Sequence, residues 1–158
     1  MMNFIPDQLH ATKLDIPFFE EQKGENIPGR GTTKSCEKLQ QEIRELMLKL
    51  EAFNTVFTPG TFADKPKRYG YRLTFRLAGV AGRMEIAALP IRNETATRKD
   101  RALAQALYLV RNWLEAEVFS QVYRPGSMPL VPYLIGAGDK TVIEALVESG
   151  SLPLLVSG

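Results

Sequence analysis

Alternating apolar and polar residues define one stretch of this chain, from Tyr69 to Leu77. Tyrosine, leucine or phenylalanine occupies every second position, and glycine, arginine and threonine occupy the positions between them. Because successive side chains of a strand point to opposite faces, this pattern predicts a half-buried β-strand. Its apolar face packs on the rest of the protein, and Arg72 and Arg76 lie on the opposite, open face.

A second strand is predicted from about Arg83 to Ile91, in a hairpin with the first. A short strand through residues 56–57 precedes both, and Pro59-Gly60 is predicted to form the turn that ends it. A four-residue loop at 78–81 keeps the apolar residues of the hairpin on one face. This register sets Arg76 opposite Arg83, and like charges directly opposite each other are unfavourable in a sheet. A bound anion would explain that pair better than folding would.

Apolar residues recur at helical spacing in three further stretches. They predict a first helix from about Ser35 to Phe53, a long helix from about Thr97 to Val122 and a short last helix from about Asp139 to Ser149. The expected fold class is therefore α+β. A small antiparallel sheet of two to three strands packs against two main helices, with a short C-terminal helix and an extended N-terminal arm in addition.

The arm is predicted for residues 1–34, because proline and glycine interrupt any regular period there. Ile-Pro pairs recur in it at a constant spacing of eleven residues, beginning at Ile5, Ile16 and Ile27. The spacing is either a coincidence in a loop or a set of apolar anchors that lie on the domain or on a partner. A single domain is expected at 35–150, followed by an apolar C-terminal tail at 151–158.

Composition narrows the class of protein. With 158 residues, of which 44% are hydrophobic and 24% charged, the chain is long enough for one core. The only cysteine, Cys36, excludes an internal disulfide, and with the only histidine, His10, it cannot supply a zinc cage. No apolar run reaches membrane-spanning length, and the N-terminus lacks the pattern of a signal peptide. We therefore expect a cytoplasmic protein with no membrane contact, no metal and no cofactor.

No catalytic motif is complete in the sequence. The run 29–35 ends in Lys-Ser, but Thr33 stands where a phosphate-binding loop requires glycine. Imidazole-dependent catalysis has only His10 available, in the N-terminal arm. A metal-dependent nuclease centred on Glu85 lacks the lysine of the usual strand spacing, because Ala87 stands there. The sequence favours a non-enzymatic protein and leaves enzymatic activity as the weaker alternative.

The charge of the chain is unevenly distributed, although its net value is only +2. Residues 64–112 contain eleven Lys/Arg and four Asp/Glu, an excess of seven positive charges, while residues 1–63 and 113–158 are net negative. Clustered cations attract polyanions because they neutralise phosphates and release counterions. The first turn of the long helix is also basic, although the helix dipole favours acids or an anionic ligand there.

These observations predict a nucleic-acid-binding surface on the basic segment. The residues predicted to form it are Lys65, Lys67, Arg68, Tyr69, Arg72, Arg76, Arg83, Arg98, Lys99 and Arg101. Such a surface contacts phosphates with little base-specific readout, so DNA and RNA are both candidate ligands. Alternatively, the same cations keep an exposed sheet face soluble and pair with acids of the flanking regions.

The run Thr97–Ala106, with basic residues leading into an alanine-rich helix, is similar to one motif of double-stranded RNA-binding domains. The order helix, short strand, strand, strand, helix over residues 35–122 also resembles the layout of that family. The family's Gly-Pro-containing loop with its minor-groove histidine has no counterpart in this chain, and element order alone does not establish function.

A second class of function also fits the sequence. A structural or interaction protein would assemble through the N-terminal arm and the apolar tail around Leu152–Val156, as a homo-oligomer or on a protein partner. Removal of the arm separates the two hypotheses. Nucleic-acid affinity should survive that removal, whereas an assembly that depends on the arm should not.

Overall fold

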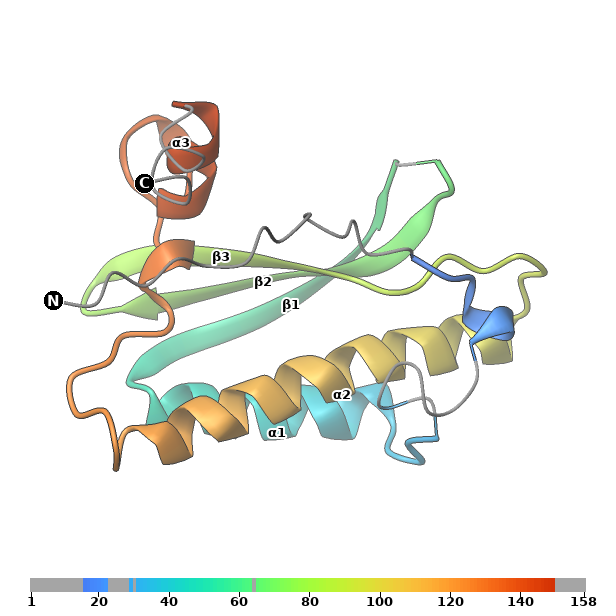
Figure 1. Cartoon of the computed structure of the whole chain (residues 1–158), viewed down its shortest axis with the longest axis horizontal. Coiled ribbons are helices and arrows are strands. Elements are labelled where there is room, and N and C mark those ends of the chain that lie inside the picture. The colour runs from blue at the N-terminus through green and yellow to red at the C-terminus, as the bar shows by residue number, and fades with distance from the viewer. Residues whose placement is uncertain (1–15, 23–28, 30, 64, 150–158) are drawn as a thin grey trace, which may run out of the picture.

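A three-stranded antiparallel sheet and two long helices make up most of the protein (Figure 1). The structure is a computed structural model, and it describes residues 16–22, 29, 31–63 and 65–149. The main elements are α1 (Cys36–Lys49), β1 (Ala52–Phe62), β2 (Arg68–Leu77), β3 (Val80–Ala87), α2 (Ala96–Ser120) and α3 (Val142–Glu148). The predicted α+β fold class is confirmed, including the short C-terminal helix.

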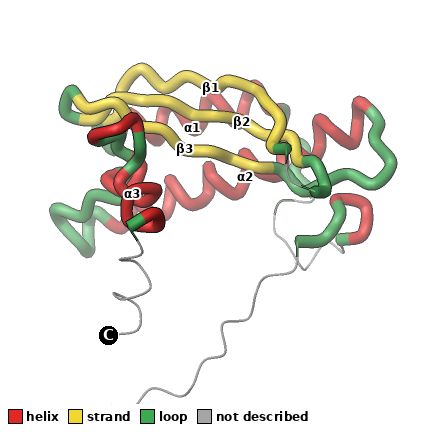
Figure 2. Tube along the Cα trace, turned by 90° about the horizontal axis from the view of Figure 1, so that it is seen from above, coloured by secondary structure: helices red, strands yellow, loops and turns green. Residues whose placement is uncertain are grey.

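The strands lie side by side in the order β1-β2-β3, and each pairs antiparallel with its neighbour. Figures 1 and 2 show α1 and α2 next to each other on one face of the sheet, whereas α3 lies beside the β3 edge. Leu134 forms an isolated bridge with Gly82 of β3, so the chain returns to the sheet after α2. Among the described residues, no helix covers the other face of the sheet over β1 and β2.

The core lies between the sheet and the two long helices. Alternate residues of β2 from 71 to 77 are buried, and the arginines between them are exposed, as the alternation predicts. Fully buried side chains of the helices meet this face, and they are Leu39, Ile43, Met47, Leu107 and Leu114. Burial of these apolar side chains is the main free-energy gain that holds the layers together.

Both long helices begin at a side-chain cap. The hydroxyl oxygens of Ser35 and Thr95 each accept a hydrogen bond from the backbone N–H three residues later, at 3.1 Å. α1 ends at Lys49 rather than at the predicted Phe53. The reason is that Glu51 adopts the left-handed conformation (φ 64°), and the chain then enters β1.

The hairpin between β2 and β3 differs from the predicted one. Its turn has two residues, 78–79, with φ values of 50° and 79°, and such a turn matches the twist of paired strands. The predicted four-residue loop is therefore wrong. Arg76 lies opposite Ala81, and Arg83 lies opposite Thr74. Within this described hairpin no arginine lies opposite another. The repulsion that led us to expect a bound anion between Arg76 and Arg83 is therefore absent.

β1 is longer than predicted. Pro59 and Gly60, which the sequence predicts as a turn, lie inside the strand, and pairing continues to Phe62 opposite Arg68. Proline is tolerated there because β1 is an edge strand, and one row of its backbone groups needs no partner strand. The tip of the β1–β2 hairpin is therefore displaced to residues 63–67.

Part of the predicted N-terminal arm packs on the domain. In the segment 16–22, Phe19 is only 2% exposed and lies in a small apolar cluster with Ala88 and Ala102. The segment therefore lies at the end of the domain where α2 begins (Figure 1). The other two Ile-Pro pairs, at Ile5 and Ile27, and the predicted tail at 151–158 lie outside the described residues.

Candidate nucleic-acid interface

Two lysines from different elements lie over one tyrosine ring. Lys67 Nζ is 4.8 Å from the centroid of the Tyr69 ring, and Lys99 Nζ is 4.3 Å from it. The negative face of an aromatic ring attracts a cation at such distances. Neither ammonium has an ion-pair partner within the part of the chain that the structure describes. The two charges are therefore available to an external anion.

The topology explains why both lysines contact Tyr69. β2 starts at the hairpin tip, and the loop after β3 returns the chain to the same end before α2 begins (Figure 1). The first turn of α2, with Lys99, then lies near the first residues of β2. The pKa of Lys67 lies above its ordinary value, chiefly because its ammonium hydrogen-bonds to the Tyr69 side chain. Lys67 is therefore fully charged at neutral pH.

Two more of the predicted residues lie at this end of the sheet. Lys65 is exposed in the hairpin tip. Arg68 is half-buried and donates hydrogen bonds to two backbone carbonyls, at 2.8 Å to Ala88 and 3.1 Å to Ala87. These hydrogen bonds connect the start of β2 with the end of β3. Arg68 therefore stabilises the sheet, and its positive charge also adds to the charge at this end of the domain.

The arginines near the start of α2 have partners within the protein. Arg98 donates to the carbonyl of Asn93 at 2.7 Å and lies 3.9 Å from the carboxylate of Glu20. Arg101 pairs with Asp100 at 2.9 Å and donates to the carbonyl of Thr32 at 3.0 Å. Asp100, the residue before Arg101, supplies one compensating carboxylate. The additional carboxylate, that of Glu20, comes from the N-terminal segment.

Glu20 is held close to the start of α2 by backbone donors. Its carboxylate accepts hydrogen bonds from the N–H groups of Arg92 (3.1 Å) and Asn93 (2.6 Å). Burial alone would raise the pKa of Glu20, but these donors and the nearby Arg98 outweigh it and hold the pKa below its ordinary value. Glu20 is therefore ionised at neutral pH and offsets part of the charge of Arg98.

The remaining predicted arginines lie on the open face of the sheet in different environments. Arg72 pairs with Glu85 at 3.0 Å, and the two side chains are 55% and 47% exposed. Arg76 is exposed and donates to the carbonyl of Gly79 at 3.1 Å. Arg83 is only 15% exposed and pairs with Glu144 at 2.9 Å. Arg83 is therefore part of the contact with the C-terminal segment rather than of a free surface.

The structure thus divides the predicted set. It brings Lys67, Tyr69 and Lys99 into contact, with Lys65 and Arg68 at the same end of the sheet. It leaves Arg72 and Arg76 exposed on the open face, and it engages Arg83, Arg98 and Arg101 with groups of the protein itself. Tyr69 lies on the helix-facing side of β2, because it alternates with Gly70 and Arg72.

The surroundings of Cys36 favour a structural role for its thiol. Its Sγ lies 3.5 Å from the backbone oxygen of Asp100 and 3.6 Å from the side-chain Oδ1 of the same residue. Burial, and next the negative charge of Asp100, raise the pKa of the thiol above its ordinary value. Burial likewise raises the pKa of the neighbouring Tyr71 to about 12. Both groups are therefore protonated at neutral pH, and the thiol is a poor nucleophile.

Two further features bear on the kind of site. In the described ranges, no group of three or more His, Cys, Asp or Glu residues could hold a metal ion. None of the helices there is long and apolar enough to cross a membrane.

Comparison with protein-family models, curated protein sequences and solved structures gave no match for this chain. The function proposed for this chain therefore follows from the geometry of its own residues.

Proposed function

We propose that the protein binds nucleic acid without catalysing a reaction, through phosphate contacts at the hairpin-tip end of the domain. The observation that carries this proposal is the pair of ammonium groups of Lys67 and Lys99 over the ring of Tyr69. The two ammonium groups lie 4.8 and 4.3 Å from the centroid of the same ring, and neither forms an ion pair with another described residue. A phosphate near this ring would be attracted by both charges and would release counterions.

Neighbouring groups support an extended rather than a single-ion site. Lys65 in the hairpin tip and the charge of Arg68 lie along the same end. A polyanion would contact several of these groups at once, whereas a single phosphate would engage the two lysines. The resemblance of the element order to double-stranded RNA-binding domains agrees with contact at the start of α2, on layout alone.

Ion pairs within the protein support a smaller phosphate-contacting surface than the sequence predicts. Arg83 and Arg98 each have a carboxylate partner from a flanking segment, Glu144 and Glu20. The alternative interpretation, that the cations pair with acids of the flanks, therefore fits these two residues. The residues proposed to contact phosphates are accordingly Lys65, Lys67 and Lys99, with Arg68, Arg72 and Arg76 contributing charge.

Fluorescence anisotropy tests the proposal, with labelled single- and double-stranded DNA and RNA over a series of salt concentrations. In the variant Lys67→Ala/Lys99→Ala, affinity should fall, and the slope of log affinity against log salt should decrease by about two. The matched control is Lys49→Ala/Arg124→Ala, which removes the same charge at the opposite end of the domain. Equal losses in both variants would show only a general charge effect, and no binding at low salt would refute the proposal.

A second candidate function is assembly with another copy or a protein partner. The observation that favours it is the exposed apolar surface of α3, where Val142, Ile143 and Val147 are 40%, 39% and 58% exposed. Because Phe19 is buried in the domain, a truncation that tests the N-terminal arm should start the chain at residue 16. A change of oligomeric state in light scattering, for that truncation or for Val147→Ser, would support assembly.

A further inference from the structure

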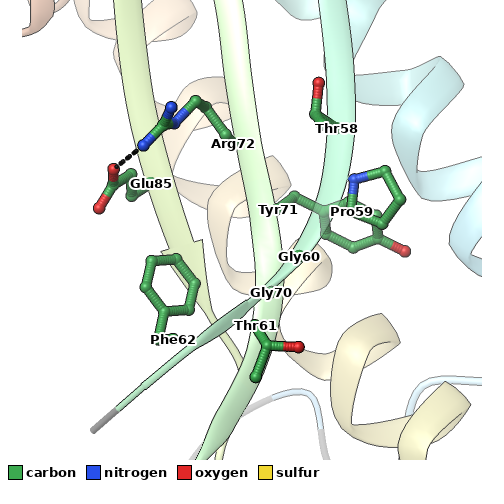
Figure 3. Close-up of a pocket in the computed structure, with 9 residues that line it drawn as sticks. All are labelled: Thr58, Pro59, Gly60, Thr61, Phe62, Gly70, Tyr71, Arg72 and Glu85. Atoms are coloured by element: carbon green, nitrogen blue, oxygen red, sulfur yellow. Dashed lines mark hydrogen bonds and ion pairs between the residues drawn. The ribbon is translucent and has the colours of Figure 1, made fainter.

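A second feature of the basic region lies on the open face of the sheet, next to the hairpin tip. It is a shallow cavity of about 230 Å³ near the end of β1, shown in Figure 3. The residues that define it on the open face are Thr58, Gly60, Phe62, Gly70, Arg72 and Glu85. Its volume is below the roughly 300–1,000 Å³ of pockets that enclose drug-sized ligands, so it is suited to one planar group rather than a whole ligand.

Two glycines make this cavity possible. Gly60 of β1 lies directly opposite Gly70 of β2. A Cβ atom on Gly70 would lie 2.5 Å from Phe62 Cε2 and 2.0 Å from the carbonyl oxygen of Ile86, so the Phe62 ring lies against bare backbone. A Cβ atom on Gly60 would meet no atom within 4 Å. The space above Gly60 is therefore open, and the ring of Phe62 lies beside it.

The walls of the cavity offer complementary chemistry. Figure 3 shows the Phe62 ring on one side and the Arg72–Glu85 pair further along the same face. A phenylalanine ring stacks on planar groups, and a guanidinium and a carboxylate supply hydrogen-bond donors and acceptors. Because both members of the pair are about half exposed, at 55% and 47%, they can exchange partners at low cost. A nucleobase has the matching properties of a flat ring and polar edges.

The position of the cavity connects it with the proposed phosphate surface. Phe62 is the last residue of β1, pairs with Arg68, and is followed directly by the hairpin tip that carries Lys65 and Lys67. The arginines at 68, 72 and 76 lie on the open face of β2, and Glu85 of β3 lies opposite Arg72. The surroundings of the cavity are thus positively charged, which complements a nucleic-acid backbone.

We propose that this cavity takes one unpaired base of a single-stranded nucleic acid, stacked on Phe62, while the adjoining phosphates contact Arg72 and Lys65 of the hairpin tip. The inference rests on the proposed function and specifies its ligand. A base paired within a duplex does not present its face, so the cavity selects single strands or unpaired ends. Every base has a π-face, and DNA and RNA strands therefore share the relevant chemistry.

The test compares two variants of the cavity with a control on the same strand. Phe62→Leu keeps an apolar side chain but removes the stacking face, and Gly60→Leu fills the open space without removing any group. The control, Phe53→Ala, removes another aromatic ring of β1, which is 54% exposed and pairs with Arg76, far from the cavity. Far-ultraviolet circular dichroism and thermal melting establish that each variant is folded.

Anisotropy is measured with 12-nucleotide oligo(dT), oligo(U), an abasic oligomer of the same length, and a duplex. Phe62→Leu and Gly60→Leu should each weaken binding of oligo(dT) and oligo(U) by about tenfold, the effect of losing one stacked base. Binding of the duplex and of the abasic oligomer should change less than twofold. Phe62→Trp, which keeps a stacking face, should retain the affinity of the natural protein, and so should Phe53→Ala.

The outcomes separate this inference from the proposed function. If both cavity variants bind oligo(dT) and oligo(U) as the natural protein does, while Lys67→Ala/Lys99→Ala weakens binding, the cavity is not a base site and the phosphate surface stands. Equal affinity for the abasic oligomer and for oligo(dT) would also overturn the inference. If no oligonucleotide binds at low salt, both proposals fail.

Discussion

Two segments outside the α1–β1–β2–β3–α2 unit contact its opposite ends, and they do so through different kinds of interaction. The N-terminal segment, residues 16–22, buries Phe19, and the amides of Gln22 and Gln105 exchange two buried hydrogen bonds of 2.8 Å. In the C-terminal segment, residues 134–148, no apolar side chain is fully buried. Its first residue, Leu134, packs partly buried against the core, and after it the segment contacts β3 through one backbone bridge and through Arg83, which pairs with Glu144 and donates to the carbonyl of Asp139.

The difference shows which of the two contacts should weaken with added salt or at low pH. Apolar burial is insensitive to salt screening, whereas an ion pair between partly exposed groups contributes little and is weakened by salt and acid. The N-terminal segment therefore belongs to the folding unit. The C-terminal segment is expected to detach from β3 before the rest of the domain unfolds.

The largest expected effect is on the N-terminal contact. Phe19→Ala should lower the free energy of unfolding by about 3 kcal/mol, because it removes a fully buried ring and leaves a cavity. Phe53→Ala is the control, because Phe53 is 54% exposed and its loss should change stability by less than about 0.5 kcal/mol. Urea denaturation measures both. Equal effects would mean that segment 16–22 is not part of the folding unit.

The next effect concerns the buried amide pair. Gln105→Leu removes the side chain with which Gln22 exchanges its hydrogen bonds, and a buried polar group left without that partner should cost about 1–3 kcal/mol. The double variant Gln22→Leu/Gln105→Leu should be more stable than Gln105→Leu alone, because it no longer leaves the amide of Gln22 buried without the side chain to which it bonds. Urea denaturation checks this, and a double variant less stable than Gln105→Leu alone would contradict it.

A smaller and local effect is expected at the C-terminal contact. Arg83→Gln removes the ion pair with Glu144, so amide hydrogen exchange in residues 142–148 should accelerate by about two- to fivefold, the factor typical of a partly exposed pair. Exchange in residues 16–22 should not change. Arg72→Gln is the control, because its partner, Glu85, lies on β3 itself. Uniform acceleration over the whole domain would show that the C-terminal contact is not independent.

The smallest effect is the pH dependence of the same contact. The hydrogen bond from Arg83, and next that from Thr141, hold the pKa of Glu144 below its ordinary value. A carboxyl with a lowered folded-state pKa stabilises the fold above its unfolded-state pKa, about 4.3, and this contribution is lost as the pH falls through the folded-state value. Protection of residues 142–148, corrected for intrinsic exchange, should be constant from pH 7 to about 5 and fall below that. Glu144→Gln should abolish the dependence.

Periodicity in the sequence predicted the main elements because it reflects local burial. The alternation at 69–77 placed Arg72 and Arg76 on the open face, and the helical repeats located α1 and α2 within a few residues. The predicted hairpin register was wrong. The observed register depends on a two-residue turn in which Ala78 has a positive φ, and the alternation of apolar and polar residues does not reveal that conformation. Phe62 was missed as a candidate residue, because Pro59-Gly60 predicts a turn before it, and only its pairing with Arg68 shows a longer strand.

The sequence by itself determined the α+β class, the alternation along β2 and the concentration of cations in residues 64–112. The tertiary structure alone decided which of those cations are neutralised. Glu144 reaches Arg83 and Glu20 reaches Arg98 from distant flanking segments, whereas Lys67 and Lys99 both lie over Tyr69 and neither forms an ion pair in the described chain. The physical reason is that burial follows a local periodic pattern, but an electrostatic interaction depends on distance in space, which only the folded chain defines.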